Sequence, residues 1–268
     1  MLTEAQIKDT VTGFIINSIE KYAEGRKKRT AKFQVLDLIM PYERNIRSIV
    51  GGLETSFGVT LWEKLAEELA SKNGFTIKDK KDHVMPADLH PGLKEIFQKV
   101  HDDRKNGQGK YDALTSHQAI KGACACLSNS PVEIFVTPPS GHGIDVWLEK
   151  NGVDYWLDLK TVQPNVGSYQ RFLLQILDWF SYYYSRWPEG NLEARIVFPY
   201  NPHSGAFWDK THDGGFPLEK EKEAWVADDF WDFLTGNTGS TEIILSSFRE
   251  IAAKGLVTKV LEDLFSTD

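Results

Sequence analysis

The chain has 268 residues, of which 41% are hydrophobic and 12% aromatic, so it can bury a sizeable core. Its net charge of -7 is an objection to a DNA partner, although positive charge can still be confined to a cleft. Cys124 and Cys126 are the two cysteines, and their spacing in a predicted helix argues against a disulfide or a thiolate zinc site. Without a signal peptide or a membrane-spanning apolar run, we expect a soluble cytoplasmic protein with buried free thiols.

The first informative element is an amphipathic helix within residues 57–75, which ends at Asn73-Gly74 and precedes a short strand. Glu63 lies at the edge of its apolar face and can point inward, whereas Glu67 lies further round the helix. An equally good interpretation of Glu63 is an ordinary surface residue. The helix therefore contributes one acidic candidate for a buried site.

Residues 78–130 interrupt the pattern before the next strands. They contain a proline-bearing loop and helices near 93–101 and 115–128, which flank a glycine-rich turn. We interpret the basic pair Arg104-Lys105 beside this turn as solvated rather than as a phosphate clamp. An insertion of this size commonly carries specificity or dimer contacts.

A β-hairpin is predicted from residues 143–148 and 155–160, with residues 149–154 as the connection. Asn151-Gly152 supplies the two residues that tolerate the positive φ of a tight turn. The flanking runs are rich in β-branched and aromatic side chains, as strands are. The second strand is apolar on both faces, which is typical of a central position in a sheet.

The open end of this hairpin carries two carboxylates and a lysine. Asp158 and Lys160 point to the same face because the side-chain period of a strand is 2, and Asp145 lies beside them. Such a group can hold Mg²⁺ for phosphodiester hydrolysis, with the carbonyl of Leu159 as a further ligand and the lysine near the attacking water. The alternative is a cross-strand ion pair on a solvated face. A carboxylate in a central strand is costly, which favours the metal site.

The remaining elements complete an α/β order. After a loop, a long amphipathic helix follows from residue 169 to 184, and its apolar stripe is more typical of core or a dimer interface than of base stacking. A strand at 194–200 comes next, and then a loop and helices at 219–234 and 241–265. The loop contains three possible metal ligands without paired spacing, which we discount: His203, His212 and Asp213.

The order Gly-Ile-Asp145, then Asp158-Leu-Lys160 on the next strand, resembles the PD-(D/E)xK nuclease superfamily, which includes many type II restriction endonucleases. Ile144 stands where that pattern often has proline. The resemblance implies a restriction-endonuclease-like core, a central mixed β-sheet flanked by helices with helical insertions. We expect one elaborated domain over residues 1–268, with a core at about 47–77 and 131–200, the insertion at 78–130 and a C-terminal helical part at 201–268.

By the same resemblance, Glu63 is the accessory acid of the site, with Glu67 or Glu54 as alternatives. Residues 51–56, the Leu-Trp-Glu63 helix and the run from Asp158 to residue 165 look closest to the TdeIII-type restriction endonucleases. This implies Mg²⁺-dependent cleavage of duplex DNA at a short palindrome, GGNCC as a guess, by a homodimer, with a cognate DNA methyltransferase in the cell that is not bound.

Four residues just past the catalytic strand are candidates for contacts with DNA, although loop or cap roles are the simpler interpretation: Gln163, Asn165, Gln170 and Arg171. Two other functions stay open. One is a repair or junction-resolving nuclease of the same fold, and the other is a catalytically silent nucleic-acid-binding protein in which the acidic hairpin is structural.

Overall fold

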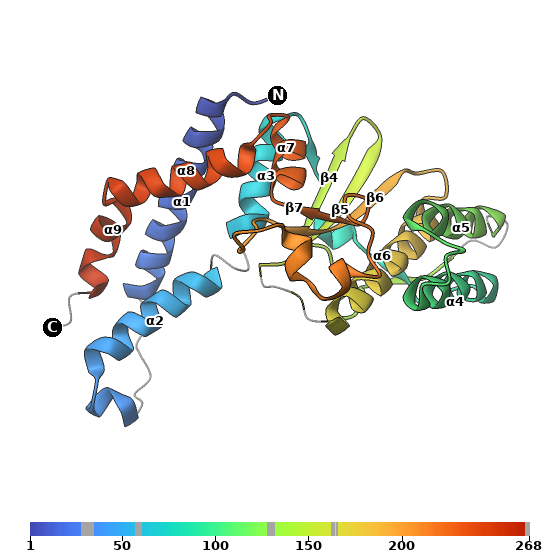
Figure 1. Ribbon diagram of the computed structural model, residues 1–268, viewed down its shortest axis with the longest axis horizontal. Helices are drawn as coiled ribbons and strands as arrows, with labels where there is room; N and C mark the ends of the chain where they lie inside the picture. Colours follow the sequence, from blue (N-terminus) through green and yellow to red (C-terminus); the bar gives the residue numbers. More distant parts are fainter. Residues whose placement is uncertain (28–34, 57–60, 128–131, 162–163, 165, 266–268) are drawn as a thin grey trace. The chain divides into compact units, whose positions relative to one another are not determined.

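The computed structural model describes residues 1–27, 35–56, 61–127, 132–161, 164 and 166–265 (Figure 1). Contacts between Cα atoms divide the chain into a unit of residues 1–73 with 231–268 and a unit of residues 74–230. The expectation of one elaborated domain stays a prediction. Within the described residues, none of the helices has the length and apolar character needed to cross a membrane.

The first unit is helical. Its helices are α1 (Glu4–Lys27), η1 (Val35–Leu38), α2 (Pro41–Ser56), α3 (Trp62–Lys72), the end of α7 (Asp228–Thr235), α8 (Ser240–Ala253) and α9 (Leu256–Phe265). Every fourth residue along one face of α1 is buried, and α8 and α9 pack against this helix. The single helix predicted at 241–265 is wrong, because Gly255 adopts a φ of 62° and separates α8 from α9.

The second unit is built on a five-stranded mixed sheet in the order β1-β4-β5-β6-β7. The strands are β1 (Thr76–Ile77), β4 (Val146–Lys150), β5 (Val153–Leu159), β6 (Leu192–Phe198) and β7 (Ala224–Val226). β1, β4 and β5 are antiparallel, whereas β5, β6 and β7 are parallel. A separate ladder joins β2 (Met85–Pro86) to β3 (Phe135–Val136). The predicted central mixed sheet is confirmed, and β5 is its middle strand.

The predicted hairpin is β4 and β5. Asn151 and Gly152 have φ values of 55° and 77°, so two residues suffice to connect the strands. The connection is shorter than residues 149–154 because pairing continues to Lys150 opposite Val153. At the other end Val146 pairs with Leu157, and the ladder leads directly to the acidic residues.

The long helix α6 (Val166–Arg186) packs against the sheet, and α4 (Pro91–Asn106) and α5 (Ala113–Cys126) pack against α6 (Figure 1). Its predicted apolar stripe is buried as core. Trp156 of β5 is fully buried, with Trp147, Trp179 and Tyr183 in edge-to-face contact around it. The side chains of Trp156 and Asp158 lie on one face of β5, since they are two residues apart. α6 therefore covers the sheet face that carries the acidic residues.

Two more sequence-based expectations are wrong: one concerns the helix at 219–234 and the other the burial of Cys126. The helix predicted at 219–234 is instead the strand β7 followed by α7, because Glu221 and Ala227 adopt φ values of 67° and 53° and β7 pairs in parallel with β6. Such pairing is a long-range effect that local periodicity does not reveal. Cys126 is exposed, so only Cys124 is the buried free thiol that was expected.

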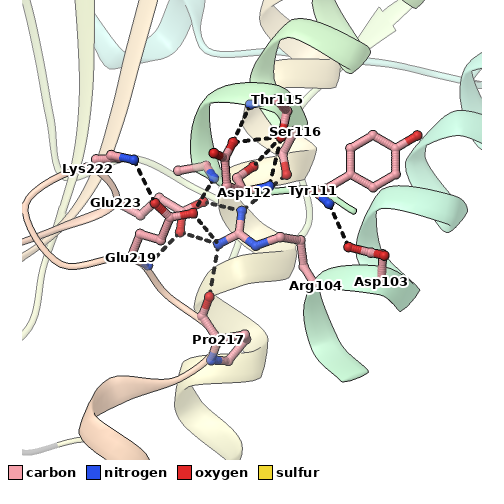
Figure 2. A network of polar contacts seen from close by, with 11 residues as sticks. Asp103, Arg104, Tyr111, Asp112, Thr115, Ser116, Pro217, Glu219, Lys222 and Glu223 are labelled. Atoms are coloured by element: carbon pink, nitrogen blue, oxygen red, sulfur yellow. Dashed lines mark hydrogen bonds and ion pairs between the residues drawn. The ribbon is translucent and has the colours of Figure 1, made fainter. Parts of the chain in front are cut away.

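Arg104 does not lie in a solvated turn, as the sequence suggested, because its side chain is only 4% exposed. Its two terminal nitrogens form a paired contact with Glu223, at 3.0 and 2.6 Å, and also donate to the Ser116 hydroxyl and the Pro217 carbonyl (Figure 2). Glu219 accepts from the backbone N–H of Ala113 in the same network. The network fastens α4 and α5 to the segment that precedes β7. Three further 3₁₀ turns complete the unit: η3 (Lys80–Asp82), η4 (Phe207–Lys210) and η5 (His212–Gly215).

Candidate active site

The hairpin brings Asp145, Asp158 and Lys160 together at its open end. The backbone N–H of Asp145 donates to the Leu157 carbonyl at 2.9 Å, and Asp145 Oδ2 accepts from the Leu159 N–H at 2.7 Å. Lys160 Nζ lies 2.5 Å from Asp158 Oδ2. Two carboxylates and one ammonium thus share a small volume at the end of the central strand, and their catalytic role stays a prediction.

Asp158 is the buried member of this group, with 4% of its surface exposed. Burial and, after it, the neighbouring charge of Asp145 raise the pKa of its carboxyl to about 7, although Lys160 acts in the opposite direction. Apart from the Lys160 ammonium, Asp158 Oδ2 meets no hydrogen-bond donor among the described residues. When both carboxyl groups are ionised, the Lys160 ammonium neutralises only one of the two negative charges, so an additional positive charge would be favourable here. The donor set therefore fits a hard divalent cation.

The protein ligands available to such a cation are few. In the part of the chain that the structure describes, there is no cluster of three or more His, Cys, Asp or Glu side chains suited to a metal ion. A cation at the hairpin would rest on Asp145, Asp158, backbone oxygen such as that of Leu159, and water. Mg²⁺ commonly binds in this way, through one or two carboxylates with several retained waters.

Lys160 is held in place from two sides. Its backbone N–H donates to the Val197 carbonyl of β6 at 2.8 Å, which continues the parallel ladder beyond β5. Its ammonium lies 5.8 Å from the centre of the Phe172 ring on α6, and its side chain is 30% exposed. The ammonium is therefore next to the carboxylates and still accessible to a substrate.

The three glutamates considered for the role of accessory acid lie in the helical unit. Glu63 and Glu67 are half-buried on α3, and Glu54 is exposed on α2. The hairpin belongs to the unit of residues 74–230, and the two units are described separately. The choice among these three glutamates stays a prediction.

Of the four candidate DNA contacts, Gln163 and Asn165 lie outside the described residues. Gln170 and Arg171 are exposed in the early part of α6, and Arg171 donates to the Ser168 hydroxyl at 3.1 Å. Both are polar and accessible, as a DNA contact requires. Their role stays a prediction.

Sequence reasoning missed a second lysine next to the site. Lys80 Nζ donates to the backbone carbonyl of Asp145 at 2.6 Å. The lysine-rich turn after β1 is visible in the sequence, but its proximity to Asp145 depends on the pairing of β1 beside β4. Sheet order, rather than any local signal, brings this cation to the backbone of Asp145.

A mixed sheet with an Asp and an Asp-Leu-Lys triplet at the end of its central hairpin, covered by a helix, defines a restriction-endonuclease-like fold. The family model for the type II restriction endonuclease HinfI matches residues 3–252, which is nearly the whole chain. The chain belongs to the HinfI family of type II restriction endonucleases. This confirms the resemblance to type II restriction endonucleases, while the narrower TdeIII-type resemblance stays a prediction.

A curated relative agrees with the family. The chain is 24% identical over 210 residues to the type II restriction enzyme MjaII of Methanocaldococcus jannaschii. The match covers 75% of this chain and 53% of MjaII, so the chain spans about half the length of that relative. No solved structure matches the chain.

Proposed function

We propose that the protein is a Mg²⁺-dependent endodeoxyribonuclease that hydrolyses phosphodiester bonds of double-stranded DNA at a short palindromic site. The family supports the reaction class. The observation that carries the proposal is the buried Asp158 carboxylate, which lies beside Asp145 and Lys160 on the central strand. A carboxylate with a raised pKa, next to an accessible lysine, is typical of a catalytic site.

In this proposal Asp145 and Asp158 hold the ion, together with the carbonyl of Leu159. A bound Mg²⁺ supplies Lewis acidity toward the phosphate and toward water. Lys160 orients the attacking water and donates a hydrogen bond to the charge that develops on the phosphate. The Leu159 N–H keeps the Asp145 carboxylate turned toward Asp158. Attack in line with the leaving oxygen then breaks the bond to the 3′ or 5′ oxygen.

The wider functional assignment follows from the reaction. A palindromic duplex has two-fold symmetry, so a homodimer would present one hairpin to each strand. Gln170 and Arg171, with Gln163 and Asn165, are the proposed contacts to DNA, and GGNCC stays the guess for the site. We place the enzyme in the cytoplasm, without a membrane partner, beside an unbound cognate methyltransferase that protects host DNA.

The test is digestion of unmethylated phage-length DNA with Mg²⁺ or with EDTA. We expect discrete bands with Mg²⁺, none with EDTA, and loss of cleavage in Asp145→Asn, Asp158→Asn and Lys160→Gln. Lys150→Gln is the matched control, because Lys150 lies at the turn end of the same hairpin. A smear would indicate a repair or junction-resolving nuclease. Intact DNA, with no Ca²⁺ binding that depends on Asp145 and Asp158, would indicate a silent binding module.

A further inference from the structure

The segment that leads into the catalytic hairpin is held by three consecutive contacts with α6. Gln175 Nε2 donates to the Gly143 carbonyl at 3.3 Å, and Trp179 Nε1 donates to the His142 carbonyl at 2.9 Å. The third contact joins side chains, because His142 Nδ1 lies 2.9 Å from Asp178 Oδ2. Gln175, Asp178 and Trp179 lie on one face of the helix, at positions i, i+3 and i+4. A single helix face therefore holds both backbone and side chain of this segment.

The His142–Asp178 pair differs from a surface ion pair. The Asp178 side chain is 13% exposed and that of His142 is 28% exposed. Burial raises the pKa of the Asp178 carboxyl to about 6, and His142 acts in the opposite direction. By contrast, His101 Nδ1 lies 3.6 Å from an Asp102 carboxylate whose side chain is 53% exposed. A largely buried carboxylate needs its partner, so removal of His142 should change the local geometry.

This segment determines where the Asp145 carboxylate lies. Asp145 follows His142 by three residues and precedes β4, which begins at Val146. Between them Ile144 is buried, so the chain has little freedom to readjust. The same helix also contacts Lys160 through the Phe172 ring. α6 is therefore the common support for the segment before Asp145 and for the catalytic lysine.

We infer that His142 and Asp178 are positioning residues that hold the Asp145 carboxylate where it can share a divalent cation with Asp158. This inference rests on the proposed function, since it assigns the pair to the support of the same site. Neither residue is a catalytic residue. Outer partners that orient metal ligands typically change metal affinity or activity about 10- to 100-fold when they are removed.

The test compares His142→Ala, His142→Asn and Asp178→Leu with the control His101→Ala. Ca²⁺ binding is measured by calorimetry without DNA, and kcat and KM for DNA are measured with Mg²⁺. We expect His142→Ala and Asp178→Leu to weaken Ca²⁺ binding and to lower kcat, each by about 10- to 100-fold, with KM nearly unchanged. His142→Asn should regain most of both, because its amide nitrogen can take the place of Nδ1 beside the Asp178 carboxylate. His101→Ala should behave as wild type.

A purely structural pair would give a different pattern. Thermal unfolding would shift to lower temperature, while the folded variants kept wild-type Ca²⁺ affinity and kcat, and that result would overturn the inference. If wild type cuts DNA, Asp145→Asn does not, and His142→Ala cuts as fast as wild type, the inference fails and the proposed function stands. If wild type does not cut DNA, the proposed function fails, and the Ca²⁺ affinity then tests the inference about His142 and Asp178. Equal Ca²⁺ affinity in wild type and His142→Ala overturns that inference, and so does the absence of Ca²⁺ binding in both proteins.

Discussion

Replacing Arg104 by methionine should strongly destabilise the unit of residues 74–230. The change leaves the Glu223 carboxylate, whose side chain is 3% exposed, with the Glu219 backbone N–H as its remaining hydrogen-bond donor among the described residues. Removing one partner of a buried ion pair costs about 3–5 kcal/mol, because the other charge stays buried without compensation. For a unit of this size about 1 kcal/mol lowers Tm by roughly 2–4 °C, so the expected loss is roughly 6–20 °C.

The assays are thermal melts, which give Tm, and urea unfolding, which gives the free energy of unfolding, both followed by tryptophan fluorescence. The double variant Arg104→Met with Glu223→Leu should regain most of the lost stability, since apolar replacement of a whole buried ion pair is often neutral. Lys99→Met is the control, because Lys99 forms an exposed pair with Glu95 on the same helix, at 2.6 Å, and should change stability very little. The reasoning is refuted if Arg104→Met is as mild as Lys99→Met, or if the two buried changes destabilise additively.

Three further predictions concern the hairpin. Because the folded pKa of Asp158 is raised from 3.8 to about 7, the metal-free protein should lose stability as pH rises from about 4 to about 7. Asp158→Asn should reduce this slope in thermal melts with EDTA, and the slope that remains below about pH 6 belongs to Asp178. Added Ca²⁺ should raise Tm of wild type above pH 7 and leave Asp158→Asn unchanged; an equal rise in both would contradict the metal site. Gly152→Ala should destabilise the hairpin by about 1 kcal/mol, because Gly152 has a φ of 77° that alanine rarely adopts. Gly122 in α5 has equally open space for a Cβ atom but an ordinary φ, so Gly122→Ala should stabilise the protein by up to about 1 kcal/mol. Equal effects of the two changes in urea unfolding would refute this.

Local signals in the sequence were sufficient for the elements that carry the candidate site. Asn151-Gly152 between β-rich runs predicted the hairpin, and the apolar character of both faces predicted that β5 is central. The apolar stripe predicted α6 and its burial. Periodicity also indicated that Asp158 and Lys160 share a face. These features depend on neighbours within a few residues, so the sequence alone displays them.

The parts that were missed depend on pairing between distant segments. β7 is three residues long and exists because it pairs with β6, so no local pattern marks it as a strand. Arg104 pairs with Glu223, which lies 119 residues later in the sequence. Because of this distant partner, the arginine is part of a buried ion pair, whereas the local sequence suggested a solvated turn. Lys80 meets Asp145 through the order of the sheet, and His142 meets Asp178 through the docking of α6. Each of these contacts is a tertiary event.

The position of β5 between an antiparallel and a parallel neighbour has a consequence for the order of folding. A hairpin forms within about 1–10 μs, whereas the parallel partner β6 must first wait for the intervening crossover helix α6. We therefore expect the nascent hairpin to carry a hydrated Asp158 with an ordinary acidity, and the docking of α6 and β6 to dehydrate it afterwards. Proton uptake that lags behind hairpin formation in temperature-jump relaxation near pH 6 would reveal this sequence of events, and simultaneous uptake would rule it out. The end of β5 that carries Asp158 would then be the last part of the strand to reach its native, dehydrated environment.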